Sequence, residues 1–385
     1  MTDTFIPFAK PTIDETTITT VGEVLRSGWI TSGPKVQAFE KLLSEYCGGR
    51  PVRTFNSGTC TMEIALRIAG IGPGDEVITT PMTFAASVNV IEHTGARPVL
   101  VDVVPDTLNL DPQGLAAAVT ARTKAVLPVH YAGHPADLDA INDVARARGL
   151  AVIEDAAHAL PARYKGRLIG SGPNPVAFSF YATKNLTTGE GGMLTADPAL
   201  LDRARVVSLH GMSRDAWRRY DQGGSWHYDI LLPGFKYNMT DIQAALGLRQ
   251  LEKLASFQRR RRQVVARYAE GFADLDAVQL PVERPEVEHA WHLYVLRLRP
   301  KALRLDRDAF IRELAARHIG TSVHFIPIHL HPYYRDRYGY APHSFPVAWS
   351  NYRRMLSLPL NPRLTDGDVT DVIEAVRDVV RVNRR

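Results

Sequence analysis

Short apolar runs alternate with helical patterns along the first 200 residues of the chain. The runs are rich in β-branched residues, show little apolar–polar alternation, and lie at residues 76–80, 97–103, 124–131, 150–156 and 175–182. Apolar residues at helical spacing lie before the first run, at residues 61–70, and between later runs, at residues 136–149. Apolar strands separated by helices are typical of a largely parallel sheet covered on both faces. The pattern therefore predicts an α/β fold.

The pattern after residue 240 predicts one long helix. Thr240 followed by Gln243 matches a capping box just before a helical spacing of apolar residues. Four arginines at 259–262 lie within this helix, and because consecutive helical residues point about 100° apart they wrap around it. We expect them to form a solvated helix surface. We expect the helix to connect a large domain, residues 1–245, with a smaller C-terminal α/β domain, residues 246–385.

Composition narrows the class of protein. The chain has 385 residues, of which 45% are hydrophobic and 23% charged, and this is typical of a folded protein with room for two domains. We expect a cytoplasmic protein without membrane contact, because the N-terminus has no leader pattern and no apolar run reaches the roughly 18 residues of a membrane helix. The net charge of +5 is too small to favour nucleic acid but suits a phosphate-bearing small molecule. Cys47 and Cys60 lack a metal-type spacing and are expected to be reduced thiols.

Lys184 stands out because lysine is scarce in this chain: nine of the 46 basic residues are lysines and the others are arginines. It lies in FSFYATKNLTTGEGG, residues 178–192, where a strand-like run breaks into a turn. A lysine at a strand end is most often a surface residue. A lysine desolvated in an apolar pocket, however, can lose its proton and condense with a carbonyl group, which arginine cannot do. Lys184 is therefore a candidate nucleophile.

Other polar residues follow strands of the same sheet, at the edge where parallel α/β sheets bind ligands. Asp155 ends an apolar strand, and an ionised carboxylate buried there needs a partner. Ser179 ends the next strand, and NSGTCT at 56–61 leads into a helix whose free N–H groups can receive a phosphate. The same turn is common as simple helix capping. Together with Phe84 as an aromatic, these residues describe a pyridoxal 5'-phosphate (PLP) site.

Several segments, in order, resemble the DegT/DnrJ-type sugar aminotransferases of the aspartate-aminotransferase fold (fold type I): IPFAKP, SGWITSGPKV, NSGTCTMEIAL, GPGDEVITTPMTF, PVHYAGHPADLDAI, VIEDAAHA, FSFYATKN and PGFKYNMTDIQAALGLRQL. The resemblance implies a large domain with a mostly parallel sheet flanked by helices, a smaller C-terminal α/β domain, and a homodimer with shared active sites. It implies that Lys184 condenses with the cofactor aldehyde, Asp155 binds the pyridine nitrogen and Phe84 stacks on the ring. It assigns the remaining cofactor contacts to His158 at the ring hydroxyl, to Gly58, Thr59, Cys60 and Ser179 at the phosphate, and to Asn238 from the second subunit.

The resemblance also implies a reaction. Dehydratases of this family carry a histidine where this chain has Lys184, so the lysine favours amino transfer, with Lys184 moving the proton as general acid and base. L-glutamate is the implied donor and UDP-4-ketopentose the implied acceptor, giving UDP-4-amino-4-deoxy-L-arabinose for lipid A modification in lipopolysaccharide biosynthesis. UDP-4-keto-6-deoxy-N-acetylhexosamine and GDP-4-keto-6-deoxymannose are alternative acceptors. A non-catalytic regulatory or binding protein on the same fold is a remote alternative.

Other interpretations of particular segments are weaker. An NAD-dependent oxidoreductase needs a G-x-G-x-x-G directly after a strand, which the chain lacks. His324, His329 and His331 are closely spaced but come without an acidic or cysteine partner, so we expect no metal site and interpret His324 as a substrate contact. The Gly-broken segment 215–234 is interpreted as a mobile loop over the nucleotide, a subunit contact or a packed surface loop.

Overall fold

The computed structural model describes residues 4–213 and 227–385. Its main layer is a mostly parallel sheet, which consists of two four-stranded parts joined end to end. One part has the order β3 (Arg97–Leu100), β2 (Glu76–Thr79), β4 (Thr123–Val126) and β5 (Ala151–Val152). The other has the order β1 (Val52–Phe55), β10 (Gly192–Thr195), β9 (Val176–Ser179) and β6 (Glu154–Asp155). The parts continue one another because only Ile153 separates β5 from β6. β10 is antiparallel to both of its neighbours, whereas the other pairs are parallel.

Each apolar run of the sequence overlaps at least one of these strands, and the run at 150–156 contains both β5 and β6, which confirms the predicted α/β fold. The observed strands are shorter than the runs. The run at 124–131 leaves the regular ladder after Val126, because Pro128 has no N–H to donate to a neighbouring strand. Its carbonyl still accepts a hydrogen bond from the backbone N–H of Asp155, at 2.9 Å, so the run stays beside β6 up to the edge of the sheet.

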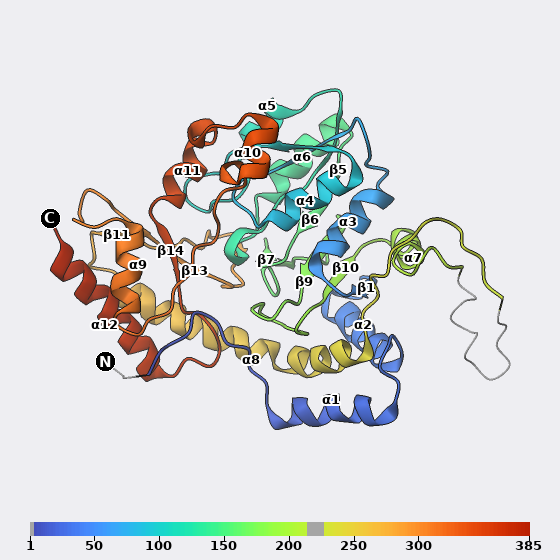
Figure 1. Ribbon diagram of the computed structural model, residues 1–385, viewed down its shortest axis with the longest axis horizontal. Helices are drawn as coiled ribbons and strands as arrows, with labels where there is room; N and C mark the ends of the chain where they lie inside the picture. Colours follow the sequence, from blue (N-terminus) through green and yellow to red (C-terminus); the bar gives the residue numbers. More distant parts are fainter. Residues whose placement is uncertain (1–3, 214–226) are drawn as a thin grey trace.

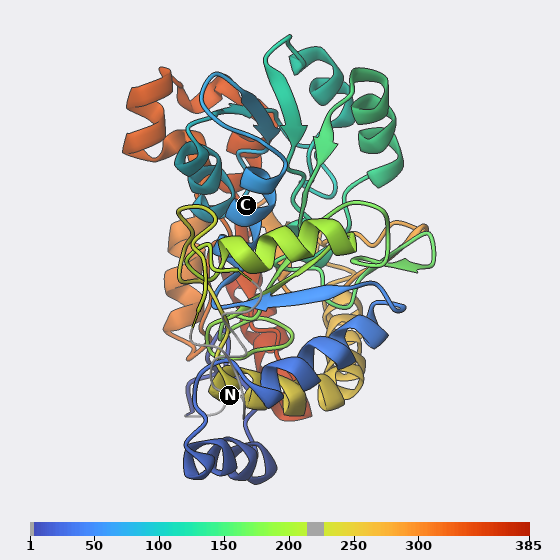
Figure 2. The ribbon, with the colours of Figure 1, turned by 90° about the vertical axis from the view of Figure 1, so that its right-hand side faces the viewer.

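Helices cover both faces of the sheet, as Figure 2 shows. On one face, Val77 of β2 packs in a core with α3 (Gly58–Ile68), α4 (Ala85–Thr94) and α7 (Pro198–Val207). On the other face, the next residue, Ile78, packs with α5 (Pro112–Ala118) and α6 (Leu138–Arg148). Successive side chains of a strand point to opposite faces, so a sheet buried on both faces needs apolar residues at both positions.

The long helix α8 (Asp241–Gly271) begins with the predicted capping box between Thr240 and Gln243. Figure 1 shows it along one edge of the molecule. Its N-terminal half packs on α1 (Glu15–Ser27) and α2 (Pro34–Tyr46), and its C-terminal half packs near α12 (Asp366–Asn383). The division at residue 245 stays a prediction; α8 is continuous there, and Leu254 and Tyr268 belong to different cores.

The C-terminal core surrounds an antiparallel sheet with the order β11 (Val278–Gln279), β13 (Tyr294–Leu298) and β14 (Met355–Leu358), beside α9 (Arg307–Ala315). Ile6 packs in this core and pairs with Ile319, so the N-terminal segment contributes to the C-terminal core. Shorter elements complete the described chain: β7 (Arg163–Tyr164), β8 (Arg167–Leu168), β12 (Val287–Glu288), α10 (Pro332–Tyr338), α11 (Pro346–Tyr352), and the 3-10 turns at Tyr131–Gly133, Ile328–Leu330 and Pro342–Ser344.

Two sequence interpretations bear on particular segments. The arginine run wraps α8 as expected, but the solvated surface is wrong for Arg261, which is buried with 3% of its surface exposed. Most of the segment 215–234, interpreted as a loop over the nucleotide or a subunit contact, lies outside the described residues. Among the helices that are described, none combines the length and the apolar character that crossing a membrane requires.

Candidate active site

A cavity of about 610 Å³ opens at the edge of the sheet where β6 and β9 end. Its lining includes eight residues that the sequence singled out, namely Gly58, Thr59, Phe84, Asp155, His158, Ser179, Lys184 and His324. Cys60 and Asn238 are not part of this lining. The strand ends, the start of α3 and a C-terminal segment around His324 therefore converge on one cavity.

Lys184 lies in the turn that follows β9, and its backbone N–H donates to the Tyr181 carbonyl at 2.9 Å. Burial lowers the pKa of its amine to about 8, while the negative charge of Asp155 opposes this shift. With this pKa, about a tenth of the amine is neutral at pH 7 and about half at pH 8. A neutral amine in a cavity can attack a carbonyl carbon and can exchange protons as a base.

Asp155 ends β6 with a buried carboxylate that faces the cavity. One carboxylate oxygen accepts a hydrogen bond from the Ser87 hydroxyl at 2.6 Å, and the other accepts one from the backbone N–H of Ala157 at 3.0 Å. Thr83 in turn contacts the Ser87 hydroxyl at 2.7 Å. Hydrogen-bond donors therefore hold both oxygens of the carboxylate in place. The geometry thus presents a negative charge to a cationic group of a ligand.

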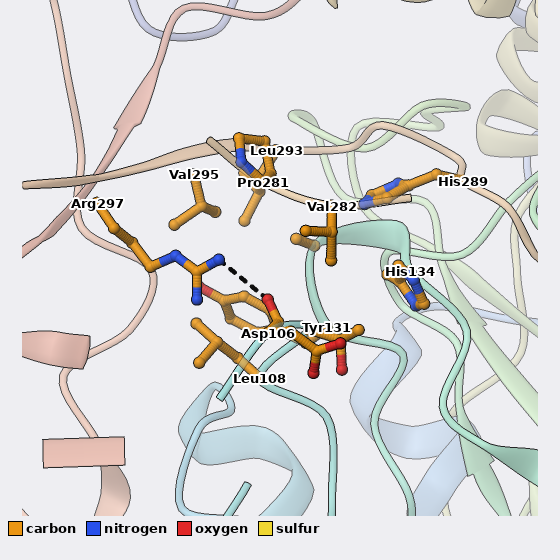
Figure 3. Close-up of a pocket in the computed structure, with 12 residues that line it drawn as sticks. Asp106, Leu108, Tyr131, His134, Pro281, Val282, His289, Leu293, Val295 and Arg297 are labelled. Atoms are coloured by element: carbon orange, nitrogen blue, oxygen red, sulfur yellow. Dashed lines mark hydrogen bonds between the residues drawn. The ribbon is translucent and has the colours of Figure 1, made fainter. Parts of the chain in front are cut away.

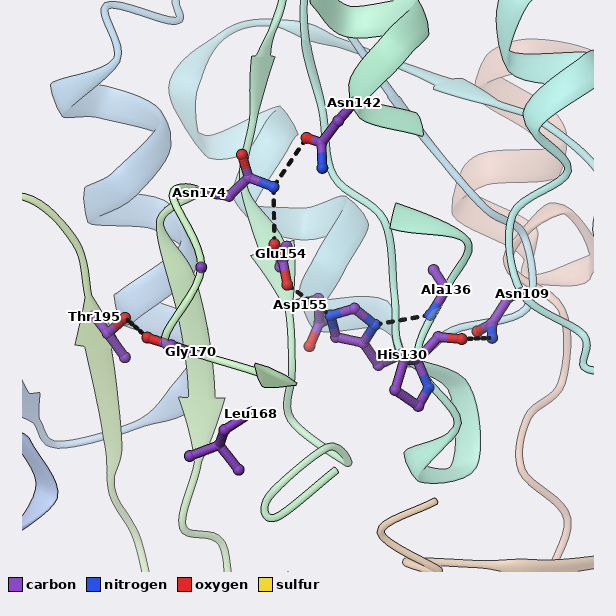
Figure 4. A network of polar contacts seen from close by, with 12 residues as sticks. Asn109, His130, Ala136, Asn142, Glu154, Asp155, Leu168, Gly170, Asn174 and Thr195 are labelled. Carbon is purple, nitrogen blue, oxygen red and sulfur yellow. Dashed lines mark hydrogen bonds and ion pairs between the residues drawn. The ribbon is translucent and has the colours of Figure 1, made fainter. Parts of the chain in front are cut away.

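A polar network on the far side of β6 holds the strand in place (Figure 4). The backbone N–H of His130 donates to the Asp155 carbonyl at 3.0 Å. Because Nδ1 of His130 accepts from Ala136 N–H at 3.0 Å, its proton sits on Nε2 and is donated to Glu154 at 2.9 Å. Asn174 donates to the other Glu154 oxygen at 2.9 Å. Sequence analysis missed this network. The one feature of the sequence that indicates it is the pair of consecutive acids Glu154 and Asp155, because successive side chains of a strand point to opposite faces of the sheet.

The start of α3 is a cradle for an anion. Ser57 caps the helix by accepting the N–H of Cys60 at 3.2 Å, whereas the N–H groups of Gly58 and Thr59 have no hydrogen-bond partner among the described residues. A Cβ on Gly58 would lie 2.7 Å from the Ser179 Cβ and 3.2 Å from its hydroxyl oxygen, so only glycine lets Ser179 come this close. Two free N–H groups and a hydroxyl at a helix N-terminus suit a phosphate.

Cys60 contributes to the capped turn rather than to the cavity. Burial raises the pKa of its thiol to about 11, and the thiol contacts Asn56 and the Ser57 carbonyl. A protonated, buried thiol is a poor nucleophile. Cys47 is buried and free as well.

His158 and His292 form a pair of buried imidazoles beside Lys184, with ring centroids 4.3 Å apart. Asn185 donates its amide N–H groups to the carbonyls of Leu160 and Ala290, so its oxygen accepts from His292 Nδ1 at 3.2 Å. His292 therefore carries its proton on Nδ1. Burial holds the pKa of both imidazoles well below their ordinary value, so both are neutral at pH 7.

His324 reaches the cavity from the C-terminal part of the chain. Its Nδ1 contacts the Ser357 hydroxyl at 2.9 Å, and its ring stacks on Phe8 with centroids 5.1 Å apart. Burial and the charge of Lys184 lower its pKa to about 4. The Tyr131 hydroxyl donates to the His324 carbonyl, which fixes this segment to the large sheet. His324 is thus a neutral hydrogen-bonding group at the cavity wall.

Arg297 of β13 strengthens the same junction (Figure 3). Its guanidinium donates to the carbonyls of Pro105 at 2.6 Å and Asp106 at 3.1 Å, next to the Tyr131 ring.

Phe84, at the start of α4, leaves 63% of its surface exposed at the cavity, and its ring centroid lies 6.0 Å from that of Phe325. An exposed aromatic face at a cavity rim is suited to stacking on a planar ligand.

The remaining predicted residues lie elsewhere. Asn238 donates to the Ser32 hydroxyl at 2.7 Å and does not reach the cavity of its own chain. His329 contacts the Pro342 carbonyl at 2.9 Å, and across residues 4–213 and 227–385 no cluster of three histidine, cysteine or acidic side chains could hold a metal ion. The metal alternative therefore has no support in the described part of the chain.

Comparison with known proteins assigns the chain to a family. The model described as the DegT/DnrJ/EryC1/StrS aminotransferase family matches residues 11–377. The chain belongs to this family. The aminotransferase is 52% identical over 379 residues to the spore coat polysaccharide biosynthesis protein SpsC of Bacillus subtilis, which covers 98% of this chain and 97% of SpsC.

Solved structures agree with the family. The aminotransferase is similar to Spr1654 from Streptococcus pneumoniae, described as a sugar aminotransferase in its PMP form, with a TM-score of 0.93, 38% identity, and 98% and 99% of the two chains covered. It is also similar to S. venezuelae DesV in complex with a ketimine intermediate, with a TM-score of 0.87, 39% identity, and 95% and 94% covered. The predicted family, fold class and sugar aminotransferase activity are thereby confirmed.

Proposed function

We propose that this aminotransferase holds PLP in the cavity around Lys184 and moves an amino group from L-glutamate to the 4-keto group of a nucleotide-linked sugar. One observation carries the proposal: a partly neutral amine, a buried carboxylate and a free helix N-terminus line a single cavity. PLP has an aldehyde, a pyridine nitrogen and a phosphate, which are the chemical counterparts of these three groups.

The lining offers one group for each reactive part of the cofactor. Lys184 supplies the amine for the aldehyde, and Asp155 supplies a negative charge for a protonated ring nitrogen. Gly58, Thr59 and Ser179 supply donors for the phosphate, and the missing Cβ at position 58 lets Ser179 lie close to the helix N-terminus. When bound, PLP withdraws the electrons released as a proton leaves the substrate carbon.

The chain's own groups then carry out orientation and proton transfer. Lys184, with a pKa of about 8, can take a proton from a substrate carbon and return it. His158 and His292 stay neutral, so neither competes with Lys184 for that proton. Phe84 and Phe325 contribute aromatic surface to the cavity lining, on which a planar ligand can stack.

The phosphate cradle predicts the effect of Gly58→Ala. The new methyl group would collide with Ser179 and push the phosphate donors apart, so we expect affinity for PLP to fall about tenfold to a hundredfold. Titration of the apoenzyme with PLP measures this change. The matched control is Gly72→Ala, whose Cβ has ordinary contacts and which should bind as wild type does. Pyridoxal without phosphate should bind both variants alike; an equal loss for pyridoxal and PLP would contradict the phosphate assignment.

The lowered pKa of Lys184 predicts how cofactor capture depends on pH. Only the neutral amine attacks the aldehyde, so the rate should rise about tenfold per pH unit below about pH 7 and level off above about pH 8. Stopped-flow mixing of apoenzyme with PLP measures the rate. A rate that still climbs tenfold per unit between about pH 9 and pH 10 would show an amine with its ordinary pKa.

The sugar is a finer part of the proposal. The segments SGWITSGPK, HYAGHPADLDAI and GFKYNMTDI support UDP-4-ketopentose as the first acceptor to test. The Bacillus relative is named for spore coat polysaccharide biosynthesis, so an extracellular polysaccharide is a second candidate destination of the product, and lipid A stays a prediction.

The acceptor is tested with enzyme that has first received its amino group from L-glutamate. The remaining glutamate is removed before the sugar is added. Conversion of added UDP-4-ketopentose to its amine supports the proposal, whereas conversion of only 4-keto-6-deoxyhexose nucleotides moves it to that class.

The homodimer is also part of the proposal. Asn238 does not line its own cavity and contacts Ser32, and the neighbouring Trp29 and Ile30 expose large apolar side chains. An exposed apolar surface of this kind supports a subunit contact, through which Asn238 would reach the second active site. A solution mass equal to one 42.7-kDa chain would contradict this arrangement.

A further inference from the structure

A second, smaller cavity lies on another side of Lys184. Four separate segments line it: residues 9–12, the loop 182–187, the middle of α8, and residues 360–362. It offers about 20 Å³ to the centre of a water-sized sphere, so its occupant is about the size of one water molecule. The cavity is therefore too small for a phosphate or for a carboxylate-bearing substrate.

The charges around this cavity are all positive. Lys10, Lys184 and Arg261 belong to its lining, and no aspartate or glutamate of the described residues does. When Lys184 is bonded to the cofactor, the positive charges of Lys10 and Arg261 still remain in the lining. Buried cations are normally paired with a carboxylate, yet Arg261 forms no ion pair within the described residues. Among residues 4–213 and 227–385, no carboxylate serves as a counterion for Arg261.

Within the described residues, all of the hydrogen bonds of Arg261 are donated by Nη1. Nη1 donates to the carbonyls of Trp291 at 3.2 Å and Leu360 at 2.8 Å, with a long contact to His292 at 3.5 Å. Nε is buried and has no partner, and Nη2 makes no hydrogen bond in the described part of the chain. The guanidinium edge formed by Nε and Nη2 is the edge that binds anions side-on.

Two neighbours add further unsatisfied groups. Asn361 is buried, and its side-chain oxygen accepts the N–H of Arg363 at 3.1 Å, while its amide nitrogen has no hydrogen-bond partner among residues 4–213 and 227–385. The Thr12 hydroxyl is buried without a partner. Buried polar groups without partners are rare in folded proteins, and each one calls for an occupant such as water or an ion.

We propose that the cavity formed by Lys10, Thr12, Arg261 and Asn361 binds one halide-sized monovalent anion, with chloride as the natural ligand. The lining residues carry a guanidinium edge, an amide nitrogen and a hydroxyl that lack partners in the described residues, together with net positive charge. A single water would meet the donors but leave that charge unbalanced. Burial also lowers the pKa of Arg261 to about 10, in keeping with a cation that has no counterion in the part of the chain that the structure describes.

Crystals of the holoenzyme grown in sodium bromide test the site directly. Bromide replaces chloride at halide sites and scatters anomalously, so we expect an anomalous peak in the cavity within hydrogen-bond distance of Arg261 Nε. Density without an anomalous peak, at a bromide concentration that labels other halide sites on the protein, would show water and overturn the proposal. This result does not depend on the sugar or on the amino donor.

A variant pair tests binding in solution. In Asn361→Asp the side chain keeps an oxygen for the N–H of Arg363 and brings its own negative charge beside Arg261. For the wild type we expect the melting temperature of the holoenzyme to rise about 2 °C per tenfold increase in sodium bromide or chloride above the Kd, relative to sodium gluconate at equal ionic strength. Asn361→Asp should lose this halide-specific rise. Asn383→Asp, which lies outside the cavity lining, should keep it.

Either of two results in that series would contradict the anion site. One is an equal rise in gluconate and in the halides, which would show a general salt effect. The other is a halide-specific rise that persists undiminished in Asn361→Asp. If Asn361→Asp fails to fold, Lys10→Ala, a change at an exposed side chain, should reduce the halide affinity and shift the rise to higher concentration.

Discussion

Lys184→Arg is expected to fold normally and to lose about 10⁴-fold in kcat, the upper range for removal of a general acid–base group. A guanidinium stays protonated at every pH at which the enzyme folds, so it can neither condense with the cofactor aldehyde nor take a proton from the substrate. The cavity of about 610 Å³ leaves room for the larger side chain, and the backbone turn at this position does not depend on the amine. Steady-state amino transfer and circular dichroism measure the two outcomes.

The matched control for this variant is Lys41→Arg. Lys41 is an exposed residue of α2 and does not line the cavity, so the same substitution there should leave kcat unchanged. Full activity of Lys184→Arg would overturn the assignment of the catalytic lysine. Loss of folding in Lys184→Arg would instead be resolved with Lys184→Ala, which adds no volume and should fold while remaining inactive.

Asp155→Asn is expected to keep PLP bound and to lower kcat by about 10³-fold, a loss typical of removing one preorganised electrostatic group. The amide has the size of the carboxylate, and its oxygen can still accept the Ser87 hydroxyl. It lacks the negative charge that keeps the ring nitrogen protonated, so the electrons released from the substrate carbon are held less well. Absorbance reports the bound cofactor, and single-turnover kinetics with L-glutamate report the chemical step.

Asp143→Asn serves as the control for charge removal. The Asp143 side chain on α6 is 72% exposed, and its loss should change neither cofactor binding nor kcat. Asp155→Glu keeps the charge at a shifted position, and it should retain more activity than Asp155→Asn. If the asparagine variant were as active as wild type, the ring nitrogen would not depend on Asp155.

Much of the candidate site could be predicted because its residues follow strand ends. Asp155 and Ser179 end neighbouring parallel strands, β6 and β9, so their side chains reach the same edge of the sheet. The phosphate turn at Gly58 was visible as small residues before a helical pattern. These signals are local, and the parallel sheet brings them together.

The residues that sequence analysis missed depend on contacts between distant segments. His292 lies 107 residues from its partner Asn185, and no periodicity of either segment indicates that they meet. Arg261 looked like one of four solvated arginines, but its burial depends on carbonyls that lie 30 and 99 residues away. Helical spacing alone cannot tell which of four arginines faces a second core.

The role of Asn238 stays a prediction for a related reason. Its proposed partner is the active site of another subunit, and the hydrogen bond to Ser32 is formed within its own chain. Local sequence can indicate that a polar residue lies near a subunit surface, but the symmetry of an assembly decides which cavity it reaches.

Borohydride reduction of the PLP-loaded enzyme, followed by peptide mapping, tests the central claim most directly. Reduction makes the bond between a lysine and the cofactor permanent, so the modified lysine keeps the added mass through digestion. We predict that the added mass is found on Lys184 alone among the nine lysines of the chain, and that prior treatment with L-glutamate prevents it. Modification of any other lysine in its place, or of none, would contradict the account of this active site.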